Sequence, residues 1–71
     1  MDRIKVISSF IDSVGYSEEK KILEIKIKKG KIYQYYSVPI ERYIGLLNAS
    51  SKGRYFDRYI RDRYRTSKKG F

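Results

Sequence analysis

The alternation of hydrophobic and polar residues predicts a β-rich first half of the chain. Residues 23–27 alternate between apolar and charged side chains, which is the period of a half-buried strand. Gly30 marks a hairpin turn, and residues 31–37 form the returning strand. The β-branched run at 4–7 predicts a further strand, and residues 8–12 are expected to form a turn after it. The first half is therefore expected to form a small antiparallel sheet.

The second half shows the spacing of two short helices. Pro39 ends the last strand and begins the first helix, because its fixed φ and missing amide suit the first helical turn. Residues 48–53 interrupt this helix, and Ser50 or Ser51 is a candidate N-cap for a second helix at 54–64. We therefore predict an α+β fold, in which a small antiparallel meander of three to four strands is followed by two short C-terminal helices packed on it.

The length of 71 residues predicts a single domain at 1–65, followed by a flexible basic tail at 66–71. A domain of this size buries only about 60% of its unfolded surface, so its core is small. The first residues lack the apolar segment of a signal peptide, and no stretch reaches the roughly 20 apolar residues of a membrane span. We therefore expect a cytoplasmic location without membrane association.

The hairpin turn decides which way the neighbouring tyrosines point. A two-residue turn would place Lys29 in the left-handed region and direct Tyr33 and Tyr35 to the outer face. A three-residue loop at 28–30 needs only glycine in that region, and it directs both tyrosines towards the core with their hydroxyls at its rim. The three-residue loop is favoured, and it places Tyr36 on the opposite face of the sheet.

The net charge of +9 is large for so short a chain and points to a polyanionic partner. Residues 52–71 contain eight basic and two acidic side chains, a net charge of +6, whereas residues 1–51 carry +3. The C-terminal third is thus the cationic end of the chain. A field of this sign attracts nucleic acids and speeds the encounter with them.

Four arginines repeat at helical spacing in the second predicted helix, within about 60° of arc at 100° per residue. They are Arg54, Arg58, Arg61 and Arg65. A row of guanidinium groups suits phosphate recognition, because each group can hold two phosphate oxygens. The same stripe also fits a helix face that is merely solvated, since two aspartates of this segment pair with it at i,i+4 spacing. Two acids cannot neutralise the surrounding bases, so we favour contact with a polyanion.

The composition argues against an enzyme. The chain has neither histidine nor cysteine, which removes the usual general base, the thiol nucleophile and the commonest metal ligands. Its carboxylates are scattered among basic residues, and no glycine-rich phosphate loop is present. We therefore expect no catalytic residue, no cofactor and no metal site.

Several short motifs resemble those of the KTSC family. They are Val14-Gly15-Tyr16, Tyr33-Gln34-Tyr35, Val38-Pro39, Ser51-Lys52-Gly53-Arg54-Tyr55-Phe56 and Ile60-Arg61-Asp62-Arg63-Tyr64. This small domain occurs at the C-terminus of some lysyl-tRNA synthetases and as stand-alone bacterial proteins. The resemblance implies no established activity, and it implies RNA binding as the usual proposal, through Tyr33, Tyr35 and residues 52–61. Lys31 and Arg65 depart from the family pattern, which commonly has glycine and proline there.

We therefore predict a non-catalytic nucleic-acid-binding domain, with RNA favoured over DNA and weak sequence preference. The predicted contact residues are Lys28, Lys31, Tyr33, Tyr35, Tyr36, Lys52, Arg54, Arg58, Arg61 and Arg65. The alternative is a protein-interaction module, such as a small phage-encoded regulator that binds an acidic protein, or a homodimer. An exposed strip at residues 32–36 of an edge strand would suit pairing of the chain with itself, and monomer and homodimer both stay open.

Overall fold

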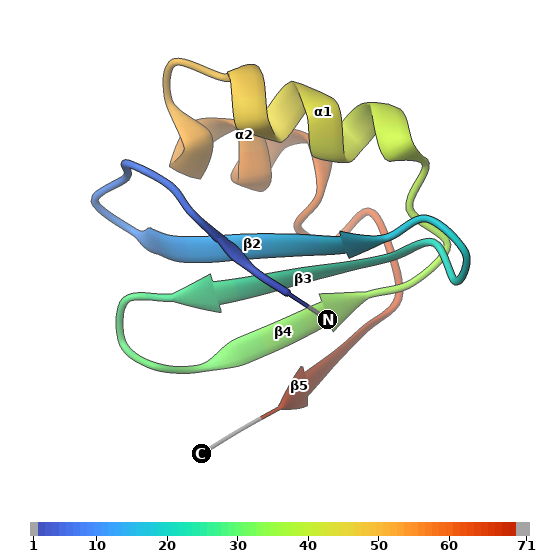
Figure 1. The fold of residues 1–71 in the computed structure, drawn as a ribbon. Helices are drawn as coiled ribbons and strands as arrows, with labels where there is room; N and C mark the ends of the chain where they lie inside the picture. Colours follow the sequence, from blue (N-terminus) through green and yellow to red (C-terminus); the bar gives the residue numbers. More distant parts are fainter. Residues whose placement is uncertain (1, 70–71) are drawn as a thin grey trace.

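The computed structural model describes residues 2–69 and shows an antiparallel sheet with both helices on one side (Figure 1). The elements in chain order are β1 (Ile4–Lys5), β2 (Ile11–Ser17), β3 (Ile22–Ile27), β4 (Ile32–Tyr35), α1 (Ile40–Asn48), α2 (Lys52–Tyr59) and β5 (Thr66–Lys69). The strands lie in the order β1-β2-β3-β4-β5. The predicted α+β class is confirmed, but the sheet has five strands rather than three to four.

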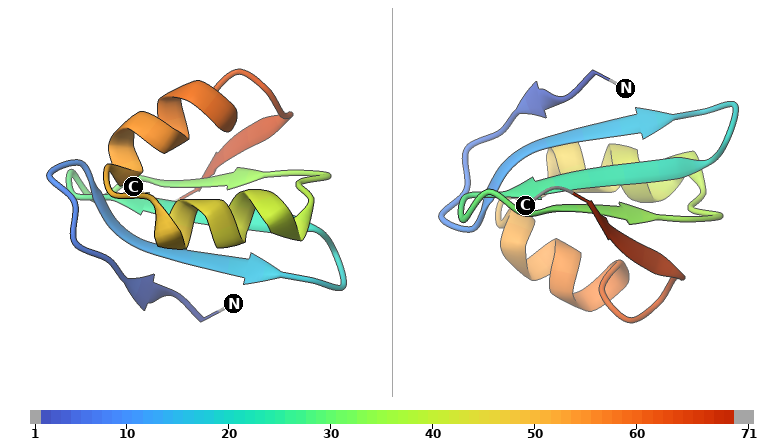
Figure 2. Two further views of the ribbon diagram at one scale, coloured as in Figure 1. Left: turned by 90° about the horizontal axis from the view of Figure 1, so that it is seen from above. Right: turned by 90° about the horizontal axis from the view of Figure 1, so that it is seen from below.

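The core lies between the sheet and the two helices, which cover the same face in both views of Figure 2. Its buried hydrophobic side chains are Ile11, Val14, Leu23, Ile25, Ile27, Tyr35, Val38, Leu46, Phe56 and Ile60. The alternating residues of β3 contribute three of these side chains, as the period of two predicts. The small core thus depends on alternate positions of the strands and on single anchors from each helix.

The hairpin between β3 and β4 has the favoured three-residue loop. Gly30 has φ of 102° and donates its backbone amide to the carbonyl of Ile27 at 2.9 Å. Ile25 pairs with Tyr33, and Leu23 pairs with Tyr35. Both tyrosines therefore share the helix-covered face of the sheet with those aliphatic side chains, as the loop length predicted.

The prediction of a flexible tail at 66–71 is wrong for the part of it that the structure describes. Residues 66–69 form β5, which pairs antiparallel with β4. The Thr66 hydroxyl donates to the carbonyl of Gln34 at 2.9 Å, and the backbone amide of Tyr36 donates to the carbonyl of Arg65 at 2.9 Å. These bonds satisfy the exposed edge of β4, which is the physical reason the segment is ordered. Residues 70 and 71 lie outside the described residues.

Two element boundaries and the position of β4 in the sheet also differ from the sequence prediction. Strand β2 begins at Ile11, inside the expected turn, because the Ser8 hydroxyl accepts the amides of Phe10 and Ile11 and completes the turn earlier. The second helix spans 52–59 rather than 54–64, and its predicted N-cap Ser51 accepts the amide of Arg54 at 3.4 Å. Strand β4 is internal, so the exposed edge strip expected at 32–36 is not present.

No helix within residues 2–69 is long and apolar enough to cross a bilayer.

Candidate nucleic-acid interface

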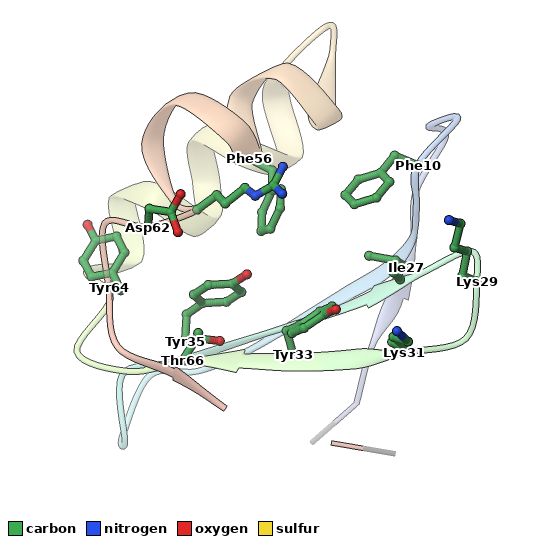
Figure 3. A pocket seen from close by; sticks show the side chains of 11 residues that line it. Phe10, Ile27, Lys29, Lys31, Tyr33, Tyr35, Phe56, Asp62, Tyr64 and Thr66 are labelled. Carbon is green, nitrogen blue, oxygen red and sulfur yellow. The ribbon is translucent and has the colours of Figure 1, made fainter. Parts of the chain in front are cut away.

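A pocket of about 400 Å³ opens on the helix-covered side of the sheet (Figure 3). It lies between the β3–β4 hairpin, the start of β2 and the turn that joins α2 to β5. Its aromatic lining consists of Phe10, Tyr33, Tyr35, Phe56 and Tyr64. The volume is within the range of about 300–1,000 Å³ that small-molecule sites occupy, so it suits one aromatic group rather than several.

The aromatic rings of the pocket support one another. Phe56 is buried, and its ring centroid lies 5.7 Å from that of Tyr35 in an edge-on arrangement with an angle of 76°. Phe10 lies 5.9 Å from the ring of Phe56 and is 39% exposed. Tyr33 is half-buried beside the core. The pocket therefore has a fixed aromatic floor and two partly exposed rings, Phe10 and Tyr33, at its opening.

Burial raises the pKa of Tyr35 above its ordinary value of 10.0. The Tyr35 hydroxyl therefore stays protonated at neutral pH, and the pocket floor carries no negative charge from this group. A neutral phenol there can both donate and accept a hydrogen bond to a ligand.

Cations and one carboxylate complete the lining. Figure 3 shows Lys29 and Lys31 at the hairpin end of the pocket and Asp62 at the other end. Arg61 also lines the pocket, and its Nη1 donates to Asp57 Oδ1 at 3.0 Å. That bond raises the pKa of Arg61 further, but both side chains are about 60% exposed. An exposed pair of this kind is worth at most about 1 kcal/mol, so a phosphate can displace it.

A second groove of about 320 Å³ follows the other side of α2 and contains Arg54, Arg58, Tyr55 and Tyr59. In the described part of the chain, no carboxylate lies within 4 Å of Arg54 or Arg58. The Arg42 guanidinium lies 5.1 Å from the ring centroid of Tyr59 and occupies one face of that ring. The second groove is therefore suited to phosphate rather than to a stacked base.

The structure brings some of the predicted site residues together. Lys31, Tyr33, Tyr35 and Arg61 line the pocket, and Arg54 and Arg58 share the second groove. Lys28 is exposed on the hairpin loop. These seven residues lie on the hairpin, on α2 or on the turn after it. The pocket brings Arg61 together with the hairpin residues, whereas Arg54 and Arg58 lie in the separate groove.

The remaining three predicted residues lie apart from the pocket. Tyr36 is on the opposite face of the sheet, where its hydroxyl shares a hydrogen bond with Ser67. The Lys52 ammonium donates to the carbonyl of Ala49 at 2.8 Å, at the end of α1. Arg65 lies beyond the end of α2, so it leaves the arginine row that the helical projection assumed.

Seven residues that line the pocket are not among the predicted contacts: Phe10, Ile27, Lys29, Phe56, Asp62, Tyr64 and Thr66. Phe56 lies within residues 52–61, to which the family resemblance points without singling it out, and Phe10 falls in the segment expected to be a turn. Lys29 carried a signal in the run of hairpin lysines. Asp62 carried none, because its approach to β4 depends on where α2 ends.

No group of three or more His, Cys, Asp or Glu side chains between residues 2 and 69 is placed to hold a metal ion.

Comparison with known proteins identifies the class to which this fold belongs. The profile of the KTSC domain matches residues 7–64, and the chain belongs to this family. The fold is similar to the crystal structure of a KTSC domain protein from Yersinia pestis, with a TM-score of 0.92, 38% identity and coverage of 97% of both chains. The resemblance drawn from the short motifs is thereby confirmed.

The relatives with similar sequences are of two kinds, small proteins and much larger ligases. An uncharacterized protein of Stutzerimonas stutzeri is 38% identical over 64 residues, which cover 90% of each chain. A lysine–tRNA ligase of a Nostoc species is 34% identical over 62 residues, which cover 87% of this chain but only 11% of the ligase. The domain therefore occurs as a small protein and as a minor part of a much larger one.

Proposed function

We propose that this domain is a non-catalytic module that binds single-stranded nucleic acid in the cytoplasm, with RNA favoured over DNA. The observation that carries the proposal is the aromatic pocket bordered by Lys29, Lys31 and Arg61. An unpaired base stacks on exposed aromatic rings with about 1–3 kcal/mol, and nearby cations hold its phosphates. Both elements occur here within one site.

The incomplete neutralisation of the basic side chains supports a polyanionic ligand. The chain carries 17 basic and 8 acidic residues, and within residues 2–69 only three ion pairs form. Two of these pairs use Arg3 and Lys5, which lie on the N-terminal segment away from the pocket. The cations along α2 and the hairpin therefore keep most of their charge available for phosphate.

The positions of the pocket and of the second groove support a path for the bound single-stranded nucleic acid. One base enters the pocket between Phe10 and Tyr33, and its phosphate meets the hairpin lysines and Arg61. The next phosphates follow α2 towards Arg54 and Arg58, which lie on the same helix within its eight residues. Recognition of the sugar–phosphate chain in this way is sequence-tolerant.

RNA is favoured over DNA because three of the relatives are lysine–tRNA ligases, which act on an RNA. The 2′-hydroxyl is the group by which a protein distinguishes the two polymers. Matched RNA and DNA hexamers test this preference directly.

Fluorescence anisotropy with a labelled RNA hexamer of mixed sequence tests the proposal. With a 5′-phosphate the hexamer carries six phosphates, and contacts to all six predict a slope of about −4 for the logarithm of affinity against the logarithm of salt concentration. Lys31→Ala is expected to weaken binding several-fold, whereas Lys20→Ala, an equal charge change on the exposed β2–β3 turn, is expected to have a smaller effect. Affinity that does not depend on salt, or equal losses in the two variants, would contradict the proposal.

A further inference from the structure

Asp62 is the one acidic residue that lines the described pocket, and it stands at the end opposite Lys29 and Lys31 (Figure 3). We infer that this carboxylate makes guanine the preferred base of the pocket. The inference rests on the proposed function, since it names the base that the same site would select.

The backbone holds Asp62 in place. Asp62 has φ of 62°, in the left-handed region, where it turns the chain from α2 towards β5. On one side of it, the amide of Arg61 donates to the carbonyl of Phe56 at 2.8 Å. On the other side, the amide of Arg63 donates to the carbonyl of Ile60 at 3.1 Å, and Ile60 is fully buried. The backbone at Asp62 is thus held by its neighbours, and this sets the point from which the carboxylate reaches the pocket before a ligand arrives.

The Asp62 carboxylate is also available to accept hydrogen bonds from a ligand. Within residues 2–69, no basic side chain lies within 4 Å of it, although the surroundings are rich in cations. The adjacent Arg61 pairs with Asp57 instead, at 3.0 Å. A ligand that donates hydrogen bonds therefore does not have to break an existing ion pair of Asp62.

The chemistry of the bases then selects guanine. An ionised carboxylate only accepts hydrogen bonds. Guanine offers it two adjacent donors, the ring N1–H and the exocyclic N2 amino group. Adenine and cytosine offer one amino group beside an acceptor, and uracil places its single N–H between two carbonyl oxygens that the carboxylate repels. Only guanine satisfies both carboxylate oxygens.

The side chains at the opposite end of the pocket also favour guanine. The far edge of guanine carries O6 and N7, which are acceptors that lysine and arginine recognise. Lys29 and Lys31 lie at that end. The aromatic rings add affinity without discrimination, because every base presents a π face. Base preference is therefore expected to come from Asp62, with the lysines reinforcing it.

Uracil hexamers with and without one central guanine test the inference by fluorescence anisotropy. The wild-type protein is expected to bind the guanine-containing hexamer at least about fivefold tighter than the all-uracil hexamer. Free GMP is expected to displace the guanine-containing hexamer from the protein better than free UMP does. Competition by the free nucleotides separates base recognition from contacts that need the whole strand.

Asp62→Asn isolates the carboxylate, because asparagine has the same shape and also tolerates a left-handed backbone. The guanine preference is expected to fall to near unity, while binding of the uracil hexamer is kept or slightly strengthened. Glu19→Gln makes the same charge change on the exposed β2–β3 turn and is expected to keep the preference. Thermal unfolding of both variants checks that they fold.

Each outcome has one meaning. Loss of the preference in Asp62→Asn but not in Glu19→Gln supports the inference. Equal wild-type binding of the two hexamers, or a preference kept by Asp62→Asn, overturns it and leaves the proposed function intact. Failure of the wild-type protein to bind any hexamer overturns both, and an acidic protein then becomes the partner to test.

Discussion

Glu24 is a charged side chain that the fold buries on the outer face of the sheet. It is 7% exposed and accepts a hydrogen bond from Gln34 Nε2 at 2.8 Å. Its second carboxylate oxygen pairs with Arg3, from the segment just before β1. A buried carboxylate is tolerated only when its oxygens have partners, so Arg3 fastens the N-terminal segment to the sheet.

Arg3→Ala is expected to lower the free energy of unfolding by about 1–2 kcal/mol, because it leaves the Glu24 carboxylate without its charged partner. Urea unfolding measures this change. Lys5→Ala is the control, since the Lys5 side chain is 85% exposed and pairs with Asp12 at 3.6 Å, and its effect is expected to stay within about 0.5 kcal/mol. Equal effects of the two substitutions would contradict this role of Arg3.

Two tyrosines make stability depend on pH in the alkaline range. Burial raises the pKa of Tyr35 and of Tyr16 above 10.0 in the folded protein. The folded state therefore holds these protons more tightly than the unfolded state does. The resulting stabilisation is fully present below pH 10 and is lost as the pH rises through the folded-state pKa values.

The free energy of unfolding is expected to fall as the pH rises above 10, and urea unfolding at several alkaline pH values measures it. Tyr35→Phe is expected to make the decline shallower, because it removes one of the two titrating hydroxyls. A decline of unchanged steepness in that variant would show that Tyr35 does not contribute.

Strand β5 is the secondary-structure element that differs most from the sequence prediction, because a flexible tail was expected there. It covers the edge of β4 and brings Thr66 to the pocket, although its sequence, Thr-Ser-Lys-Lys, carries no apolar alternation. It forms because the unpaired backbone groups of β4 need partners. That cause lies in a strand whose paired residues are 31 to 37 positions away in the chain, so the segment itself gives no signal of it.

A chain that ends at Arg65 is expected to be less stable by about 2 kcal/mol, because it loses the β4–β5 bonds and the contact of Tyr36 with Ser67. Hydrogen exchange is expected to accelerate at those β4 amides that β5 covers. A disordered tail would instead predict that truncation changes neither stability nor exchange, and that result would contradict the strand.

The hairpin register shows what the sequence could predict. Local chemistry decides it, since only glycine takes the left-handed position easily and the alternative register would bury Gln34. The positions of Tyr33 and Tyr35 in the pocket follow from that register. The end of α2 and the approach of Phe10 and Asp62 depend on tertiary packing, so the helical projection placed Arg65 wrongly and gave no hint of Asp62.

At the scale of the whole molecule, the chain combines a small core with a large excess of positive charge. The core leaves one aromatic pocket partly open on the side where the hairpin lysines and the arginines of α2 gather. The longest dimension of the domain is 28 Å, so a strand of about six nucleotides is sufficient to reach both the pocket and the second groove. Aromatic and cationic side chains thus occur together in the pocket and in the second groove.

The most direct test of this account is an NMR titration of the full chain with a single-stranded RNA hexamer of mixed sequence. Binding at the pocket is expected to change the chemical shifts of the backbone amides of Tyr33, Tyr35, Arg61 and Asp62, with smaller changes along α2. Amides far from the pocket, such as that of Lys5 in β1, are expected to stay unchanged. Shifts confined to the outer face, or no shifts at a large excess of RNA, would contradict binding at the pocket.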